Sequence, residues 1–221
     1  MTSATGVTLL IVRHAQTEQN RDGVVQGQAD NPLSELGLRQ AAALGDRLAG
    51  ERLAAVYASP LQRAQATAAA VATPHGLPVL PAPGLIEMDI GEMEGLTGAE
   101  LRLRFPEFLA AWTSERAGAA VMPGGESLDQ VQARALAAVQ AVLGEHMAGT
   151  IAVVTHNFVL LTLLCHFLGL PLHHFRRLRA HVASVSRIEF AGDRHRLVRF
   201  NDICHLEDAG VLGDDPWLRR R

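Results

Sequence analysis

An arginine and a histidine follow directly after a short apolar run near the start of the chain. The pair is Arg13-His14, and the run extends from Val7 to Val12. The run is short, continuous and rich in β-branched residues, which is typical of a strand buried on both faces. In an open α/β sheet, ligands bind beyond the carboxyl ends of the strands. A guanidinium and an imidazole at this position therefore indicate an anion site, where the histidine can act as a nucleophile or a base.

A second apolar segment, Ala54–Ala58, also leads into a basic side chain. Ser59 and Pro60 follow it, an order typical of a helix N-cap and of the first helical position. Arg63 then falls in the first turn of the expected helix, again beyond the carboxyl end of a strand. A second guanidinium at this edge strengthens the prediction of an anion site.

A third apolar segment, Ile151–Thr155, leads into His156 and Asn157, and an apolar helical pattern follows from Phe158 to Leu168. Because the carboxyl ends of parallel strands meet at one edge of a sheet, we expect all three segments to deliver an Arg or a His to the same place. Helix amino termini at that edge add free N–H groups and positive dipole ends, which favour phosphate.

These residue types suit the chemistry of a phosphate monoester, a dianion whose oxygens must be neutralised before a nucleophile can approach. Arg13 and Arg63 can do this with planar, bidentate donors, and His156 and Asn20 can donate further hydrogen bonds. A neutral His14 can attack phosphorus through one ring nitrogen while a backbone carbonyl holds the proton on the other.

The leaving alkoxide needs a proton, and Glu87 is the candidate donor. A carboxyl group near a bound dianion is expected to have a raised pKa. Once ionised, Glu87 could activate the water that hydrolyses a phosphohistidine at His14. Asp89, Glu92 and Glu94 lie close by in the sequence and are alternatives, although most carboxylates are solvated surface groups. The scheme requires no metal and no other cofactor, because fixed cations supply the electrostatic stabilisation.

The combined pattern resembles the histidine phosphatase superfamily, also called the phosphoglycerate mutase-like family, over nearly the whole chain. The matching stretches are Leu10–Asn20, Gln26-Gly27, Leu33–Gly37, Ala58–Thr67, Glu87–Gly95, Pro123–Ser127 and Val153–Val159. The resemblance implies that Arg13, His14, Arg63, Glu87 and His156 are the catalytic residues, with His14 as the phosphoryl acceptor and Glu87 as the proton donor.

The resemblance also implies that Asn20, Gln26 and Gly27 line the mouth of the phosphate and substrate site. Asn157 stands where the family usually has glycine, and we keep it as a substrate-binding residue because Asn tolerates unusual backbone angles. His181 lies close to the place where the family often has a small polar residue near the site.

Three functions are compatible with these residues: a phosphatase of small phosphorylated metabolites, a phosphoglycerate mutase, and a catalytically idle phosphate-binding regulatory module. The stretch Gln26–Leu33 lacks the Gly-Trp motif typical of the family's mutases, and Phe200–Leu206 resembles its broad-specificity phosphatase branch. The idle module is disfavoured because every catalytic residue type is present. We therefore expect a metal-independent phosphoric monoester hydrolase.

Strands and helices alternate along the chain, which favours a three-layer α/β sandwich with a mostly parallel central sheet. One helix is expected from its N-cap Ser34 to about Ala49, with an inner face of Leu38, Ala41, Ala42, Gly45 and Leu48. Another is expected from Pro60 to about Thr73. We expect residues 1–221 to form one domain, in which about 95–147 is a helical insertion over the carboxyl edge of the sheet.

Two alternating segments, Ser184–Phe190 and Arg196–Asn201, predict a strand pair near the end of the chain. The stretch Gly210–Arg221 has no periodicity and is expected to fray.

The composition is typical of a soluble enzyme: 221 residues, of which 48% are hydrophobic, with a net charge of −3. This balance gives no sign of a nucleic-acid partner, and no apolar stretch is long enough to span a bilayer, so we expect neither a nucleic-acid partner nor a membrane partner. Two cysteines are too few for a disulfide framework, and Met1–Gly6 lacks the basic region of a secretory signal. We expect a cytoplasmic protein whose partner is a small phosphorylated metabolite, with a homodimer as the commonest soluble assembly.

Overall fold

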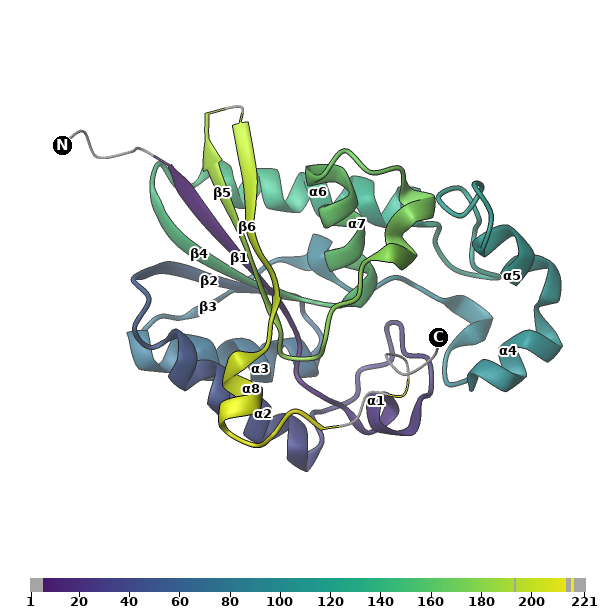
Figure 1. Ribbon diagram of the computed structural model, residues 1–221, viewed down its shortest axis with the longest axis horizontal. Coiled ribbons are helices and arrows are strands. Elements are labelled where there is room, and N and C mark those ends of the chain that lie inside the picture. Colours follow the sequence, from purple (N-terminus) through teal and green to yellow (C-terminus); the bar gives the residue numbers. More distant parts are fainter. Residues whose placement is uncertain (1–5, 193, 214–215, 217–221) are drawn as a thin grey trace.

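A six-stranded sheet forms the centre of the computed structural model, which describes residues 6–192, 194–213 and 216 (Figure 1). The strand order is β3-β2-β4-β1-β5-β6. The first four strands in this order pair in parallel, whereas β5 is antiparallel to both its neighbours. The expected mostly parallel sheet is confirmed. The strands are β1 (Val7–Arg13), β2 (Leu53–Ala58), β3 (Val79–Pro81), β4 (Gly149–Thr155), β5 (Val185–Ala191) and β6 (Arg194–Asp202).

The central strands are mostly apolar because helices cover both faces of the sheet. Successive side chains of a strand point to opposite faces. In β1, Leu9 and Ile11 therefore pack with α6 and α7, whereas Leu10 and Val12 pack with α2 and α3. Figure 1 shows one helix pair on each side of the sheet, which gives the three layers expected. The four helices are α2 (Glu35–Leu48), α3 (Gln62–Ala72), α6 (Leu128–Gly144) and α7 (Asn157–Phe167).

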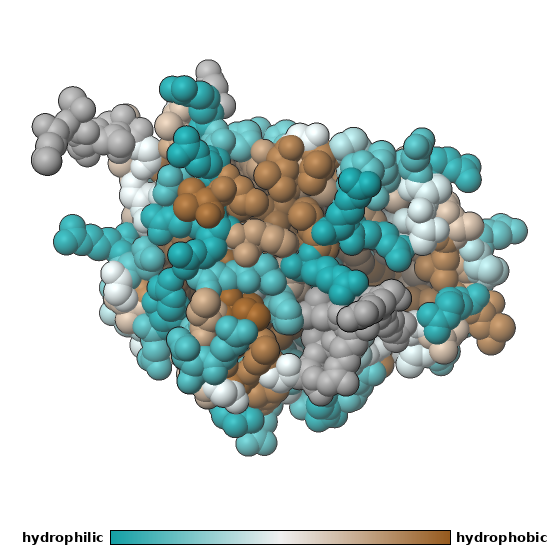
Figure 2. Space-filling model, viewed as in Figure 1, coloured by the Kyte–Doolittle hydropathy of each residue, from teal (hydrophilic) through white to brown (hydrophobic). Residues whose placement is uncertain are grey.

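The remaining helices of the described chain are shorter. They are α1 (Glu18–Asp22), α4 (Gly98–Arg104), α5 (Pro106–Trp112), α8 (Cys204–Asp208) and the 3₁₀ turns Thr73–His75, Pro83–Leu85, Gly91–Met93 and Leu172–Arg177. No helix of the described chain is long and apolar enough to cross a bilayer. On the face seen in Figure 2, an apolar area lies where the β5–β6 pair is close to α7, and hydrophilic side chains surround it.

The helix α2 begins at its expected N-cap, where Ser34 Oγ accepts a hydrogen bond of 3.0 Å from the Gly37 N–H. The expected inner face was wrong at two positions, because Leu38 is 57% exposed and Ala42 is exposed too. The buried stripe starts at Gly37, where a Cβ would lie only 2.0 Å from the Gln16 carbonyl oxygen. This close approach turns the following residue, Leu38, towards solvent.

The helix α3 begins at Gln62, two residues later than expected, and its N-cap is Leu61. The prediction that Ser59 caps this helix was therefore wrong. The Ser59 hydroxyl instead lies 2.7 Å from Nε2 of His156. Arg63 still falls in the first turn of the helix, so its expected placement is unaffected.

Only part of the segment from about 95 to 147 extends beyond the sheet. Figure 1 shows α4 and α5 at one end of the molecule, beyond α7, whereas α6 runs beside α7. The apolar face of α6, with Val131, Ala135 and Val139, joins the main core. The expectation that the whole segment covers the carboxyl edge was therefore wrong for α6, because this face needs the sheet layer for burial.

The expected strand pair near the end of the chain is present as β5 and β6. The expectation of fraying after Gly210 was wrong at Val211, which is 7% exposed. The carbonyl groups of Val211 and Leu212 both accept hydrogen bonds of 3.0 Å from the Gln40 side chain on α2. Residues 214–215 and 217–221 of this stretch lie outside the described residues.

Candidate active site

His14 follows β1 directly and is 4% exposed. Its backbone N–H donates to the Thr155 carbonyl at 2.9 Å, and its own carbonyl accepts from Ala183 at 3.0 Å, so the backbone is held on both sides. Nδ1 lies 2.7 Å from the carbonyl oxygen of Ala15. A carbonyl can only accept, so this contact places the proton of the neutral ring on Nδ1. The lone pair of Nε2 is then available for nucleophilic attack.

His156 follows β4 and is fully buried. Its ring centroid lies 5.1 Å from that of His14. Nε2 is in contact with the Ser59 hydroxyl, whereas Nδ1 is buried and has no hydrogen-bond partner in the described part of the chain. A buried nitrogen of this kind is available to a ligand.

Burial lowers the pKa of both imidazoles well below the usual value of 6.5. The charges of Arg63 and Arg13 lower the pKa of His14 further. For His156, the neighbouring His14 and then the same two arginines add to the effect of burial. Both rings are therefore neutral at neutral pH, which a nitrogen nucleophile requires.

Arg63 has no exposed surface, and backbone carbonyls fix its guanidinium. Nη2 donates to the Gly27 carbonyl at 2.7 Å and Nη1 donates to the Ala29 carbonyl at 2.8 Å. Nε is buried and has no hydrogen-bond partner among the described residues. Arg13 is also buried, and its Nη1 donates to the Ala180 carbonyl at 2.6 Å. Each arginine is thus held in one orientation before any anion arrives, which suits electrostatic stabilisation.

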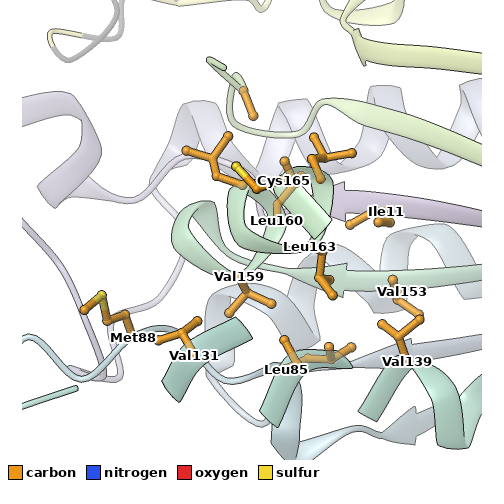
Figure 3. Close-up of a cluster of buried hydrophobic side chains, with 14 of the residues drawn as sticks. Ile11, Leu85, Met88, Val131, Val139, Val153, Val159, Leu160, Leu163 and Cys165 are labelled. Atoms are coloured by element: carbon orange, nitrogen blue, oxygen red, sulfur yellow. The ribbon is translucent and has the colours of Figure 1, made fainter. Parts of the chain in front are cut away.

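Glu87 is 3% exposed. In the sequence it stands between Leu85 and Met88, two residues of the main core that are labelled in Figure 3. Oε1 accepts a hydrogen bond of 2.8 Å from the Met88 N–H, and Oε2 accepts one of 3.2 Å from the Phe158 N–H in the first turn of α7. Burial raises the pKa of Glu87, and these two hydrogen bonds and the charges of Arg63 and Arg13 offset this only in part. The expected rise in the pKa of Glu87 is therefore present, and burial is its largest cause.

The alternative carboxylates have other positions. Glu92 is exposed, and Asp89 accepts a hydrogen bond of 2.9 Å from the Gly91 N–H. Glu94 accepts hydrogen bonds from the Gly27 and Ala29 N–H groups, and so braces the loop that holds Arg63. Of the four neighbouring carboxylates, only Glu87 is buried, and it lies within reach of the charges of the two arginines.

Asn20 and Gln26, two expected residues of the mouth, are connected through Thr17, which the sequence analysis missed. Asn20 Oδ1 accepts from the Thr17 N–H at 3.1 Å as part of the capping box of α1. The Thr17 hydroxyl also lies 2.9 Å from Gln26 Oε1. Gln26 Nε2 is buried and has no hydrogen-bond partner in the described ranges, so it is a further donor available to a ligand.

Gly27 connects Arg63 to the segment that carries Glu87. Its carbonyl accepts from Arg63, and its N–H donates to Glu94 at 2.9 Å. A Cβ at this position would lie 2.7 Å from both Met88 O and Ile90 Cγ1, so the loop needs a glycine here.

Asn157 is the half-buried first residue of α7, at the same edge as His156. The non-glycine residues of the described chain with positive φ are Ala183 and Asn201. Asn157 therefore does not need the unusual backbone angle that the sequence analysis invoked, and a glycine is not required there. His181 is half-buried, and its N–H donates to Asn201 Oδ1 at 2.7 Å.

The five expected catalytic residues thus converge at one edge of the sheet from β1, α3, the loop after β3, and β4. Two fixed arginines can neutralise a dianion, a neutral histidine can attack it, and a buried carboxyl can supply a proton. Among the residues that the structure describes, no group of three or more His, Cys, Asp or Glu side chains could hold a metal ion. Ser59 was missed as a partner of His156, although β2 and β4 pair in parallel with Ala58 opposite Val154.

Comparison with known proteins agrees with the family resemblance that the sequence motifs predict. The family model of the histidine phosphatase superfamily (branch 1) matches residues 9–203. Phosphoserine phosphatase 1 of Hydrogenobacter thermophilus is 34% identical over 205 residues, which cover 93% of this chain and 97% of the relative. Phosphoglycerate mutase-like protein 4 of Arabidopsis thaliana is 33% identical, with 92% and 89% covered. Among solved structures, Bacillus stearothermophilus YhfR superimposes with a TM-score of 0.84 at 34% identity, covering 90% of this chain and 99% of that one.

Proposed function

Because the chain belongs to the histidine phosphatase superfamily, we propose that it hydrolyses phosphate monoesters of small metabolites through a phosphohistidine at His14. The observation that carries the proposal is the geometry of His14 itself. Its Nδ1 is committed to the Ala15 carbonyl, which leaves the lone pair of Nε2 for attack. The charges of Arg63 and Arg13 are close enough to lower the pKa of the ring.

In the first step, the lone pair of His14 Nε2 forms a bond to phosphorus while the ester P–O bond breaks. The leaving oxygen takes the proton of Glu87. Arg13 and Arg63 neutralise the equatorial oxygens, and His156 Nδ1 and Gln26 Nε2 are available as further partners. In the second step, ionised Glu87 takes a proton from water as the water oxygen attacks phosphorus. The P–N bond breaks, its electron pair returns to His14, and inorganic phosphate leaves.

Phosphoglycerate mutase activity is the second candidate, and the similarity to the Arabidopsis relative named as a phosphoglycerate mutase-like protein favours it. A mutase would return the phosphoryl group to substrate instead of water. The absence of the Gly-Trp motif from Gln26–Leu33 favours hydrolysis. Conversion of 3-phosphoglycerate to 2-phosphoglycerate, with a bisphosphate primer, distinguishes the two candidates.

The function is tested by phosphate release from a panel of esters, beginning with phosphoserine because of the Hydrogenobacter relative. We expect the wild type to release phosphate from at least one ester and His14→Ala to be reduced by roughly 10³-fold or more, since removal of a nucleophile leaves only binding and electrostatic catalysis. Equal turnover by the two proteins would rule the proposal out. A cytoplasmic location and a homodimer stay predictions, which cell fractionation and sedimentation test.

A further inference from the structure

Arg134, on α6, binds the backbone of the segment that carries Glu87. Its Nη1 donates to the carbonyls of Gly84 at 2.9 Å and Ile86 at 2.6 Å. Its Nη2 donates to the carbonyl of Glu87 itself at 3.0 Å. One guanidinium therefore holds three carbonyl groups within four residues, including that of the proposed acid.

Glu126 completes this contact from the other side. Oε1 accepts from Arg134 Nε at 2.8 Å, and Oε2 accepts from Arg134 Nη2 at 2.9 Å. Oε2 also accepts from the Asp89 N–H at 2.9 Å, and the Glu126 N–H donates to the Asp89 carbonyl at 2.8 Å. Arg134 and Glu126, which we call the clamp, thus bind the chain both before and after the carboxyl group of Glu87.

The backbone of the 122–126 loop packs directly on the same segment. A Cβ on Gly125 would lie 2.3 Å from the Asp89 carbonyl oxygen, so the two backbones are in close contact. The Glu92 N–H donates to the Pro123 carbonyl at 2.9 Å. The segment from 84 to 92 is therefore fixed by α6 and its preceding loop.

The clamp matters because the Glu87 carboxyl group is held at its other end by α7, through the Phe158 N–H. The two helices pack together, and Gln132 of α6 donates to the Thr162 carbonyl of α7 at 2.8 Å. With its backbone fixed to α6 and its carboxylate fixed to α7, Glu87 has one position relative to His14. Displacements of about 1 Å in a catalytic group can cost on the order of 10²-fold in rate.

We propose that Arg134, supported by Glu126, is a positioning residue that holds Glu87 where it can protonate the leaving group. The proposal rests on the proposed function. It predicts a defect that depends on the leaving group, because an alkoxide needs the proton of Glu87 whereas nitrophenolate leaves without it.

Steady-state kinetics with alkyl phosphates (phosphoserine and glycerol phosphate) and with p-nitrophenyl phosphate test this dependence. We expect Arg134→Met to lower kcat/KM about 10- to 100-fold for the alkyl esters and less than about 3-fold for the aryl ester. Arg134→Lys keeps the charge but has fewer hydrogen-bond donors, so its kcat/KM for the alkyl esters should lie between those of the wild type and Arg134→Met. Gln140→Met, at an exposed position of the same helix, should leave both rates unchanged. An equal loss on both kinds of ester, or no loss on either, overturns the proposal.

Hydrogen exchange gives a second readout that does not depend on turnover. We expect Arg134→Met to speed amide exchange in residues 84–92 and to leave β4 unchanged. Unchanged exchange in residues 84–92 would also overturn the proposal. If the wild type releases phosphate from no ester, the proposed function fails, and the exchange measurement still decides whether Arg134 holds the segment.

Discussion

The rings of His14 and His156 lie 5.1 Å apart and are inclined by 54°. Sheet register explains this relationship, because β1 and β4 are adjacent and parallel with Arg13 opposite Thr155. The next residue on each strand is a histidine, so the two rings leave the sheet at the same level. A slip of one residue would send the side chains of a strand to opposite faces and separate the pair.

The Ser59 hydroxyl is expected to orient the His156 ring. Ser59→Ala leaves a buried ring nitrogen without its partner, so we expect a loss of about 1 to 3 kcal/mol in the free energy of unfolding. The freed ring should also lower kcat/KM about 10-fold. Urea denaturation and steady-state kinetics measure the two effects. Thr162→Ala removes another buried hydroxyl, which bonds within α7, and should change stability alone. Equal activity of Ser59→Ala and the wild type would exclude the orienting role.

Arg63→Lys should weaken phosphate binding and slow turnover. A lysine ammonium cannot donate to the Gly27 and Ala29 carbonyls in the planar geometry of the guanidinium, and it offers no planar fork to the phosphate. We expect kcat/KM to fall by roughly 10²- to 10³-fold. Inhibition by inorganic phosphate should weaken in parallel. Arg47→Lys on α2 is the matched control and should change neither value. Unaltered phosphate inhibition in Arg63→Lys would contradict the assignment.

The pH dependence of kcat/KM should report the raised pKa of Glu87. The first step needs the protonated carboxyl, so the rate should fall as pH rises through the pKa of Glu87. In Glu87→Gln this fall should disappear, and kcat/KM for alkyl esters should be about 10²- to 10⁴-fold lower. The ester itself ionises in the same way with both proteins, so this effect cancels when kcat/KM of the wild type is divided by kcat/KM of Glu87→Gln. A ratio that does not vary with pH would show that another group titrates.

Stability should fall on acidification because His156 is buried in its neutral form. Its folded-state pKa is below 6.5, so below pH 6.5 the unfolded chain binds a proton that the folded chain does not. The stabilisation is therefore present above pH 6.5 and is lost as pH falls towards the folded-state pKa. Compared with His156→Gln, the wild type should lose up to about 1.4 kcal/mol more per pH unit in this window. Urea denaturation between about pH 5 and about pH 8 measures the difference, and parallel curves would contradict it.

Local pattern was sufficient to predict the strands that position the site. The runs Val7–Val12 and Ile151–Thr155 are apolar because both faces are covered, and a polar residue can first appear where each strand leaves the core. The convergence of Arg13, His14 and His156 therefore follows from strand ends and parallel pairing. The combination of arginine and histidine side chains at these strand ends then favoured phosphoryl transfer as the predicted chemistry.

What was missed depends on contacts between residues far apart in the sequence. Ser59 has the residue type and position of an N-cap, but its hydroxyl is in contact with His156, 97 residues away. The phase of the buried stripe on α2 depends on where Gly37 meets the Gln16 backbone, so Leu38 could not be placed from periodicity alone. The raised pKa of Glu87 comes from burial in the core, which the sequence does not show directly.

Isolation of the phosphoenzyme tests the central claim most directly. Glu87→Gln mixed with radiolabelled p-nitrophenyl phosphate should accumulate the phosphoenzyme. The nitrophenolate leaves without an acid, so the phosphoenzyme still forms, whereas its hydrolysis lacks the base that Glu87 supplies. After an alkaline quench, in which phosphohistidine survives, peptide mapping should find the label on the peptide that contains His14, and His14→Ala should carry none. Label on His156 would contradict the account. So would hydrolysis of the ester by the wild type when no labelled phosphoenzyme can be isolated.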